Sequence, residues 1–123
     1  MTFKIIIPAR YQSSRLEGKP LLEIDGVPMV VHVVKQSLKS KADEVVVATD
    51  DQRIFDVVVK FGYKAIMTNL NHRSGTDRVA EVVDLMGWTD SEIVVNVQGD
   101  EPLINPLLIN QVAEYLDDQR DVF

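Results

Sequence analysis

Two short segments of the 123-residue sequence concentrate the residue types that bind phosphates and metal ions. The first segment, residues 8–20 (PARYQSSRLEGKP), carries Arg10, Arg15 and Lys19 around Gly18. Guanidinium groups grip phosphate oxygens in a bidentate fashion, an ammonium acts as a movable point charge, and glycine lets the backbone approach a ligand closely. Three cations within ten residues of a chain whose net charge is -6 favour a phosphate-binding loop over a merely solvated basic surface.

The second segment is residues 98–102 (QGDEP), which contains Gln98, Asp100 and Glu101. A carboxylate suits the Mg²⁺ that accompanies phosphates, and this ion needs only one or two carboxylates beside the phosphate oxygens. The alternative is a plain turn after a strand. The position of Asp100 after the most apolar predicted strand favours metal binding.

The predicted secondary structure places both segments directly after strands. Apolar, largely β-branched runs predict four strands, at residues 3–7, 44–48, 63–67 and 92–97. The first strand is expected to stop at Pro8, which cannot donate to a ladder. An amphipathic helix follows each strand. The residues that signal the starts of these helices are Pro28, Asp50, Ser74 and the pair Asn105 and Pro106. Gly62 and Gly87 are expected to end the second and third helices.

This alternation predicts an α/β fold with a doubly wound, mainly parallel sheet and helices on both faces. In such a sheet the ligand binds beyond the carboxyl ends of the strands, where both polar segments are expected. A chain of this length builds one hydrophobic core.

The composition excludes several classes of protein. No apolar run approaches the ~20 residues that span a bilayer, and the amino terminus lacks the long apolar region of a signal peptide, so we expect a cytoplasmic protein. The net charge of -6 argues against binding to nucleic acid. The absence of cysteine excludes disulfides and thiolate chemistry.

A third polar motif, SGTDR at residues 74–78, begins the third predicted helix. Ser74 suits capping and ligand binding equally, since a cap serine can do both. The competing interpretation is that Asp77 and Arg78 merely decorate an exposed helix. We interpret Asp50 and Asp51 as capping residues.

Together PAR, SSRL, GKP, SGTDR and VNVQGDEP resemble, in one register from Lys4 to the last residue, the 3-deoxy-manno-octulosonate cytidylyltransferase (CMP-KDO synthetase) family of Gram-negative bacteria. The likeness corresponds to the amino-terminal half of that family. One departure is Glu17, which stands where the family usually has proline and adds a negative charge beside the proposed phosphates.

The resemblance implies that residues 1–123 are the nucleotide-binding half of a single larger α/β domain. The family joins CTP to the sugar acid KDO with Mg²⁺, releasing pyrophosphate, for lipopolysaccharide biosynthesis. It implies that Arg10, Arg15 and Lys19 hold the triphosphate. The remaining implied contacts are Ala9 and Gln98 to the nucleotide, Ser74, Gly75 and Arg78 to cytosine and ribose, and Asp100 to Mg²⁺. Arg10, Lys19 and Asp100 would then be the catalytic residues.

Two alternatives remain open at this point. One is another sugar nucleotidyltransferase, such as a CMP-sialate synthetase or a guanylyltransferase. The other is a non-catalytic nucleotide-binding fragment, because residues 121–123 (DVF) look like the approach to a fifth strand. We therefore expect a piece of a longer protein, inactive alone and homodimeric at full length, with no partner among nucleic acids or membranes.

Overall fold

The computed structural model describes residues 2–12, 17–68, 75–89 and 91–120. Its elements are, in chain order, β1 (Phe3–Ala9), the 3-10 helix η1 (Lys19–Leu21), β2 (Glu23–Ile24), β3 (Val27–Pro28), α1 (Met29–Leu38), β4 (Glu44–Thr49), α2 (Gln52–Lys60), β5 (Lys64–Met67), α3 (Gly75–Met86), β6 (Ile93–Asn96) and α4 (Pro106–Arg120). Four strands form a parallel sheet in the order β5-β4-β1-β6, and β2 pairs with β3 in a separate antiparallel hairpin. The predicted alternation of strands and helices is confirmed.

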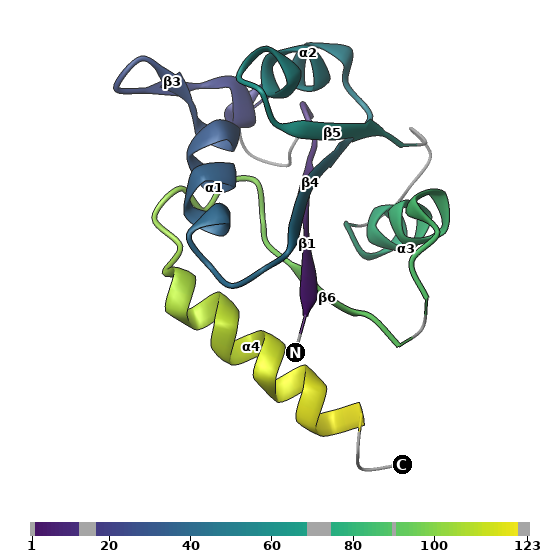
Figure 1. Cartoon of the computed structure of the whole chain (residues 1–123). Coiled ribbons are helices and arrows are strands. Elements are labelled where there is room, and N and C mark those ends of the chain that lie inside the picture. Colours follow the sequence, from purple (N-terminus) through teal and green to yellow (C-terminus); the bar gives the residue numbers. More distant parts are fainter. Residues whose placement is uncertain (1, 13–16, 69–74, 90, 121–123) are drawn as a thin grey trace.

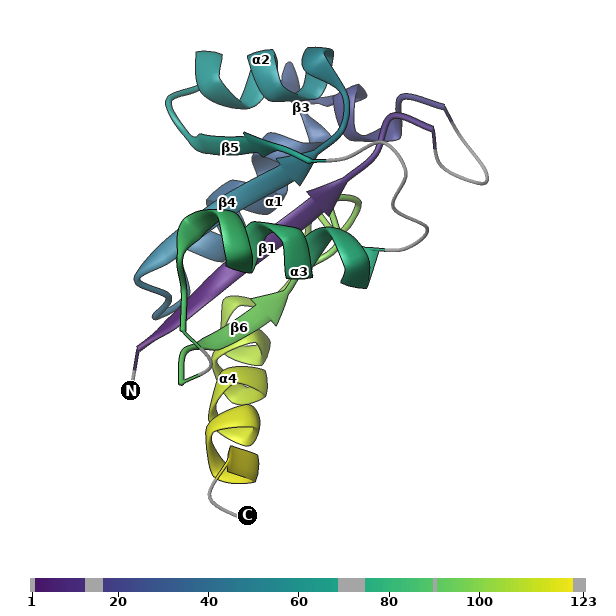
Figure 2. The ribbon, with the colours of Figure 1, turned by 90° about the vertical axis from the view of Figure 1, so that its right-hand side faces the viewer.

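Helices cover both faces of the sheet, as predicted (Figure 1). Side chains of β1 alternate between the faces because successive residues of a strand point in opposite directions. Phe3, Ile5 and Ile7 join the larger core, which contains buried residues of α1, α2 and α4. Ile6 joins the smaller core on the other face, against Val82 of α3. Figure 2 shows α3 lying across that face of the parallel strands.

The strand order reverses between β1 and β6. From β1 the chain passes through α1 to β4 and through α2 to β5, on the face of the larger core. It then returns through α3, on the other face, to β6 on the far side of β1. In open α/β sheets the loops that leave two such strands diverge and form the ligand-binding crevice. Here those loops are the two polar segments singled out in the sequence.

The prediction that β1 stops at Pro8 is wrong, because β1 continues to Ala9 and Pro8 pairs in register with Ala48. The carbonyl oxygen of Pro8 accepts a hydrogen bond from the Gly99 N–H at 3.3 Å, on the β6 side. Within a strand, the N–H and C=O of one residue point to the same neighbour. The N–H that proline lacks would therefore point past the end of β6. The β1–β4 ladder loses no hydrogen bond.

Among the helix caps that the described residues allow to be checked, one differs from the sequence prediction, and the predicted Ser74 cap of α3 lies outside those residues. Asn105 caps α4 by accepting from the Leu107 N–H at 2.9 Å, and Gly87 follows α3 with a φ of 70°. The cap of α2 is Asp51, however, whose side chain accepts from the backbone N–H groups of Arg53 and Ile54. The prediction that Asp50 caps this helix is wrong, because the cap lies one residue later and leaves Asp50 to another partner.

The β2–β3 hairpin was not predicted. Its two-residue turn is Asp25 and Gly26, with φ angles of 54° and 76°. Positive φ at both central residues is the type I′ geometry for which Asp-Gly is the usual sequence. The signal was present, but each flanking strand has only two residues and shows no alternation.

Within the described residues, no helix is long and apolar enough to cross a membrane.

Candidate functional site

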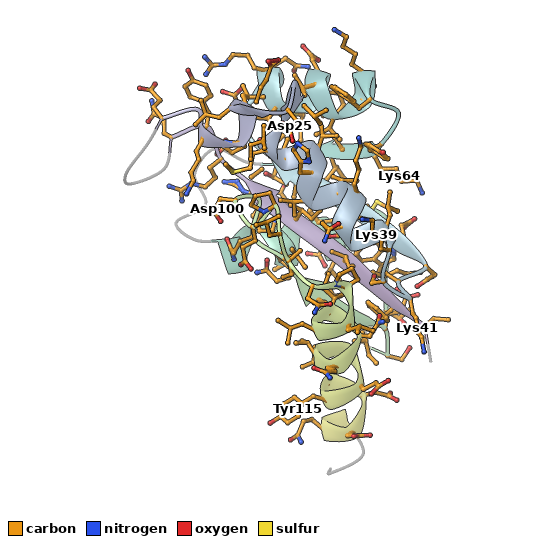
Figure 3. The ribbon with its side chains drawn as sticks, turned by 90° about the vertical axis from the view of Figure 1, so that its left-hand side faces the viewer. Asp25, Lys39, Lys41, Lys64, Asp100 and Tyr115 are labelled. Atoms are coloured by element: carbon orange, nitrogen blue, oxygen red, sulfur yellow. The ribbon has the colours of Figure 1, made fainter. Side chains whose placement is uncertain are left out.

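The structure brings the two polar segments into contact. The Nζ of Lys19, after β1, lies 3.3 Å from Oδ2 of Asp100, after β6, although the residues are 81 positions apart in the chain. Figure 3 shows Asp100 near the carboxyl end of β1. The two side chains are 38% and 48% exposed. An ion pair this exposed contributes little to stability. Both charged groups therefore remain accessible to a ligand.

A backbone hydrogen bond joins the two ends of the loop that follows β1. The N–H of Gly18 donates to the carbonyl oxygen of Tyr11 at 2.6 Å. Gly18 has a φ of 74°, and a Cβ added there would lie 3.0 Å from the Tyr11 ring. Glycine is thus favoured by the backbone conformation, and the Tyr11 ring leaves little room for a side chain. The contact brings together the backbone segments that carry Arg10 and Lys19.

The other residues predicted to bind the nucleotide occupy different positions at this edge. Arg10 is exposed, and its guanidinium donates to the carbonyl oxygen of Gln12 at 3.1 Å. Ala9 is buried in the larger core, so only its backbone is available. Gln98 is exposed, and Gly75 is the first residue of α3. Arg15 and Ser74 lie outside the described residues.

Arg78 is fully buried, so the interpretation that it decorates an exposed helix is wrong. Its guanidinium donates to Oδ2 of Asp50 at 2.9 Å and to Oγ1 of Thr68 at 3.4 Å. Burial lowers the pKa of Arg78, and the negative charge of Asp50 opposes this shift. The pair joins α3 to the ends of β4 and β5. The role of Arg78 toward cytosine and ribose stays a prediction.

Asp50 and Thr68, which hold the Arg78 guanidinium, were not predicted to lie beside it. Each directly follows its strand, β4 or β5, at the edge where the polar loops gather. The sequence signal for both residues was their position directly after a strand. Asp50 was interpreted as a helix cap, so this signal was not used.

The described residues contain no group of three His, Asp or Glu side chains that could hold a metal ion by themselves. Asp100 is instead a single exposed carboxylate beside the ammonium of Lys19, with the exposed Glu101 next in the chain. This donor set fits Mg²⁺, which takes most of its ligands from phosphates and water. It does not fit an ion that needs a complete protein cage.

Gly99 sets the distance between the two loops. A Cβ added to Gly99 would lie 3.0 Å from the Pro8 carbonyl oxygen and 3.1 Å from the Ala9 Cβ. Both contacts are tighter than ordinary van der Waals contact, and both partners belong to the central strand. Glycine therefore allows the segment after β6 to pack directly on the end of β1.

We expect Gly99→Ala to lower the free energy of unfolding by about 1 kcal/mol. Overpacking costs about 1 to 3 kcal/mol, which exceeds the ~0.4 to 1 kcal/mol gained by restricting the unfolded chain. Denaturant unfolding measures the change, with Gln98→Ala, an exposed neighbour, as the control. Equal or greater stability of Gly99→Ala would contradict the close packing.

Comparison with known proteins identifies the family. The sequence matches the cytidylyltransferase family over residues 4–122. The chain belongs to this family. This cytidylyltransferase chain is 60% identical over 116 residues to the 3-deoxy-manno-octulosonate cytidylyltransferase of Vibrio vulnificus, a match that covers 94% of the chain and 46% of the relative. It is 54% identical over 121 residues to the enzyme of the same name from Thioalkalivibrio sulfidiphilus, covering 98% and 48%.

Solved structures agree with this assignment. The cytidylyltransferase chain superposes with a TM-score of 0.81 and 48% identity on a CMP:2-keto-3-deoxy-manno-octonic acid synthetase complexed with CTP, over 98% of the chain and 48% of that structure. It also matches a nucleotidyl transferase from Methanothermobacter thermautotroptrophicus with a TM-score of 0.75, over 92% and 57%, where 20% identity shows the fold alone. The resemblance and the predicted fold class are confirmed. The chain spans about half the length of the curated relatives it matches.

Proposed function

We propose that the full-length protein couples CTP with 3-deoxy-D-manno-octulosonate, giving CMP-KDO and pyrophosphate, and that this chain supplies the nucleotide-binding half. The observation that carries the proposal is the contact between Lys19 and Asp100 at the point where the strand order reverses. A related synthetase of 48% identity is complexed with CTP, which favours this substrate over those of other sugar nucleotidyltransferases.

The proposed mechanism relies on positioning and charge neutralisation, which dominate phosphoryl-type transfer. A hydroxyl of the sugar acid would bond to the α-phosphorus of CTP while the bond to pyrophosphate breaks, so no side-chain nucleophile is needed. Arg10, Arg15 and Lys19 would neutralise the triphosphate and the departing pyrophosphate. Asp100 would hold Mg²⁺, which when bound supplies positive charge to the phosphate oxygens.

The biological setting belongs to the same proposal. A place in lipopolysaccharide biosynthesis is what the family resemblance implies for this activity. Action in the cytoplasm and assembly as a homodimer rest on the family resemblance.

A nucleotide panel tests the proposed function. We expect the full-length protein to prefer CTP over ATP and GTP, and to release pyrophosphate only when KDO and Mg²⁺ are both present. Pyrophosphate release is measured with each nucleotide, with and without KDO and with the metal chelated. Equal turnover with GTP and a hexose phosphate would contradict the proposed function.

A further inference from the structure

A cluster at the start of α2 reaches the loop that carries the proposed phosphate-binding cations. The guanidinium carbon of Arg53 lies 3.4 Å from the centre of the Tyr11 ring. A cation within about 6 Å of an aromatic centroid is attracted by the ring, and arginine can also stack its plane on the ring. The contact joins residues 42 positions apart, since Tyr11 follows β1 and Arg53 lies in the first turn of α2.

Asp51 fixes the orientation of this guanidinium. Nε of Arg53 donates to Oδ1 of Asp51 at 3.1 Å, and Nη2 donates to Oδ2 at 2.7 Å. Such a two-bond fork holds the plane of the guanidinium group. Asp51 is itself held in place because it caps α2. The hydrogen bond to Asp51 raises the pKa of Arg53 and lowers that of the carboxyl group.

Tyr11 links this cluster to the phosphate-binding segment. Its carbonyl oxygen accepts the Gly18 N–H, and its ring fills the space where a side chain on Gly18 would lie. Arg10 precedes Tyr11 and Lys19 follows Gly18. Any restraint on Tyr11 is therefore a restraint on the backbone that presents both cations.

The competing interpretation is an exposed ion pair that does nothing for binding. The Arg53 side chain is 58% exposed, and an exposed pair with Asp51 has little effect on stability by itself. That interpretation explains the two bonds to Asp51. It does not explain why the guanidinium also lies against a ring whose own backbone holds Gly18.

We propose that Arg53 is a positioning residue: oriented by Asp51 and stacked on Tyr11, it keeps Tyr11 bonded to Gly18 and so presents Arg10 and Lys19 together to the triphosphate. The role toward the triphosphate rests on the proposed function. Arg53 itself need not touch the nucleotide.

The test uses full-length protein with Arg53→Gln, Arg53→Lys and, as control, Lys60→Gln. Lys60 lies at the other end of α2, so its replacement makes the same change of charge away from Tyr11. Two quantities are measured: hydrogen exchange of the Gly18 amide and the Kd of CTP by calorimetry. Arg53→Gln keeps the Asp51 cap, so α2 stays intact.

We expect Arg53→Gln to speed Gly18 exchange and to raise the Kd of CTP, each about two- to fivefold, the factor that an exposed cation–π contact supplies. Arg53→Lys keeps the charge but loses both the two-bond fork to Asp51, which holds the group over the ring, and the planar group that stacks on Tyr11, so it should resemble Arg53→Gln in Gly18 exchange. Lys60→Gln should match the unaltered protein in both measurements.

Three results would overturn the proposal. The first is unchanged Gly18 exchange in Arg53→Gln, and the second is faster exchange with unchanged CTP affinity. The third is an Arg53→Lys variant that behaves like the unaltered protein, since charge alone would then suffice. Failure of the unaltered protein to bind CTP would instead overturn the proposed function, while Gly18 exchange would still decide whether Arg53 holds Tyr11.

Discussion

Lys19→Ala and Asp100→Asn are each expected to lower turnover of the full-length protein by about 10²-fold or more while the fold stays intact. Groups that stabilise developing charge in a transition state are typically worth ~3 to 4 kcal/mol. The two side chains meet at the reversal of the strand order, where the triphosphate is proposed to bind. Pyrophosphate release at saturating CTP and KDO measures the loss.

Lys41→Ala is the matched control for Lys19→Ala, because Lys41 is exposed and precedes β4, at the opposite end of the strands. Thermal unfolding should differ little among these variants, since the exposed Lys19–Asp100 pair contributes at most about 1 kcal/mol. A near-normal rate for Lys19→Ala or Asp100→Asn would show that the altered residue is a surface residue without a catalytic role.

The largest loss of stability is expected from Asp50→Ala. Arg78 is fully buried, so removing its partner leaves an uncompensated charge in the protein interior. Breaking such a pair costs about 3 to 5 kcal/mol. We expect the lower end, about 3 kcal/mol, because the Asp50 side chain is 16% exposed. A fall in Tm of about 10 °C corresponds to this change.

The exposed pair of Lys64 and Glu44 provides a matched control. Its Nζ–Oε2 distance of 2.9 Å equals the Nη2–Oδ2 distance between Arg78 and Asp50, but the Lys64 side chain is 65% exposed. Glu44→Gln should therefore cost less than about 1 kcal/mol. Replacing both members of the buried pair by apolar residues, Asp50→Leu with Arg78→Met, should recover much of the loss. Equal effects of Asp50→Ala and Glu44→Gln would show that burial does not govern the pair.

The sequence was sufficient to predict the layers of the fold and the edge of the sheet at which the two polar segments meet. Apolar periodicity distinguishes strands from helices, and parallel topology carries the residues that follow β1 and β6 to the same edge. The meeting of Lys19 and Asp100 is consistent with that placement.

Other features depend on tertiary contacts that no local pattern encodes. Two adjacent aspartates were equally good caps, and only the packing of α3 assigns Asp50 to Arg78. Pro8 is tolerated within β1 because β6 ends before reaching it, a fact about the neighbouring strand. The contact between Tyr11 and Arg53 likewise requires the loop and α2 to be placed side by side.

The central position of β1 has a consequence for synthesis on the ribosome. This strand emerges before both of its partners, since it pairs with residues 44–49 on one side and with residues 93–96 on the other. At ~5 to 20 residues per second, its second partner emerges about 5 to 20 s later. During that interval the run Ile5–Ile7 lacks its final covering, and such apolar β-branched segments aggregate readily. Lys4 and Pro8 flank this run. The charge of Lys4 and the missing N–H of Pro8 are features of gatekeeper residues, which reduce the aggregation of exposed strands.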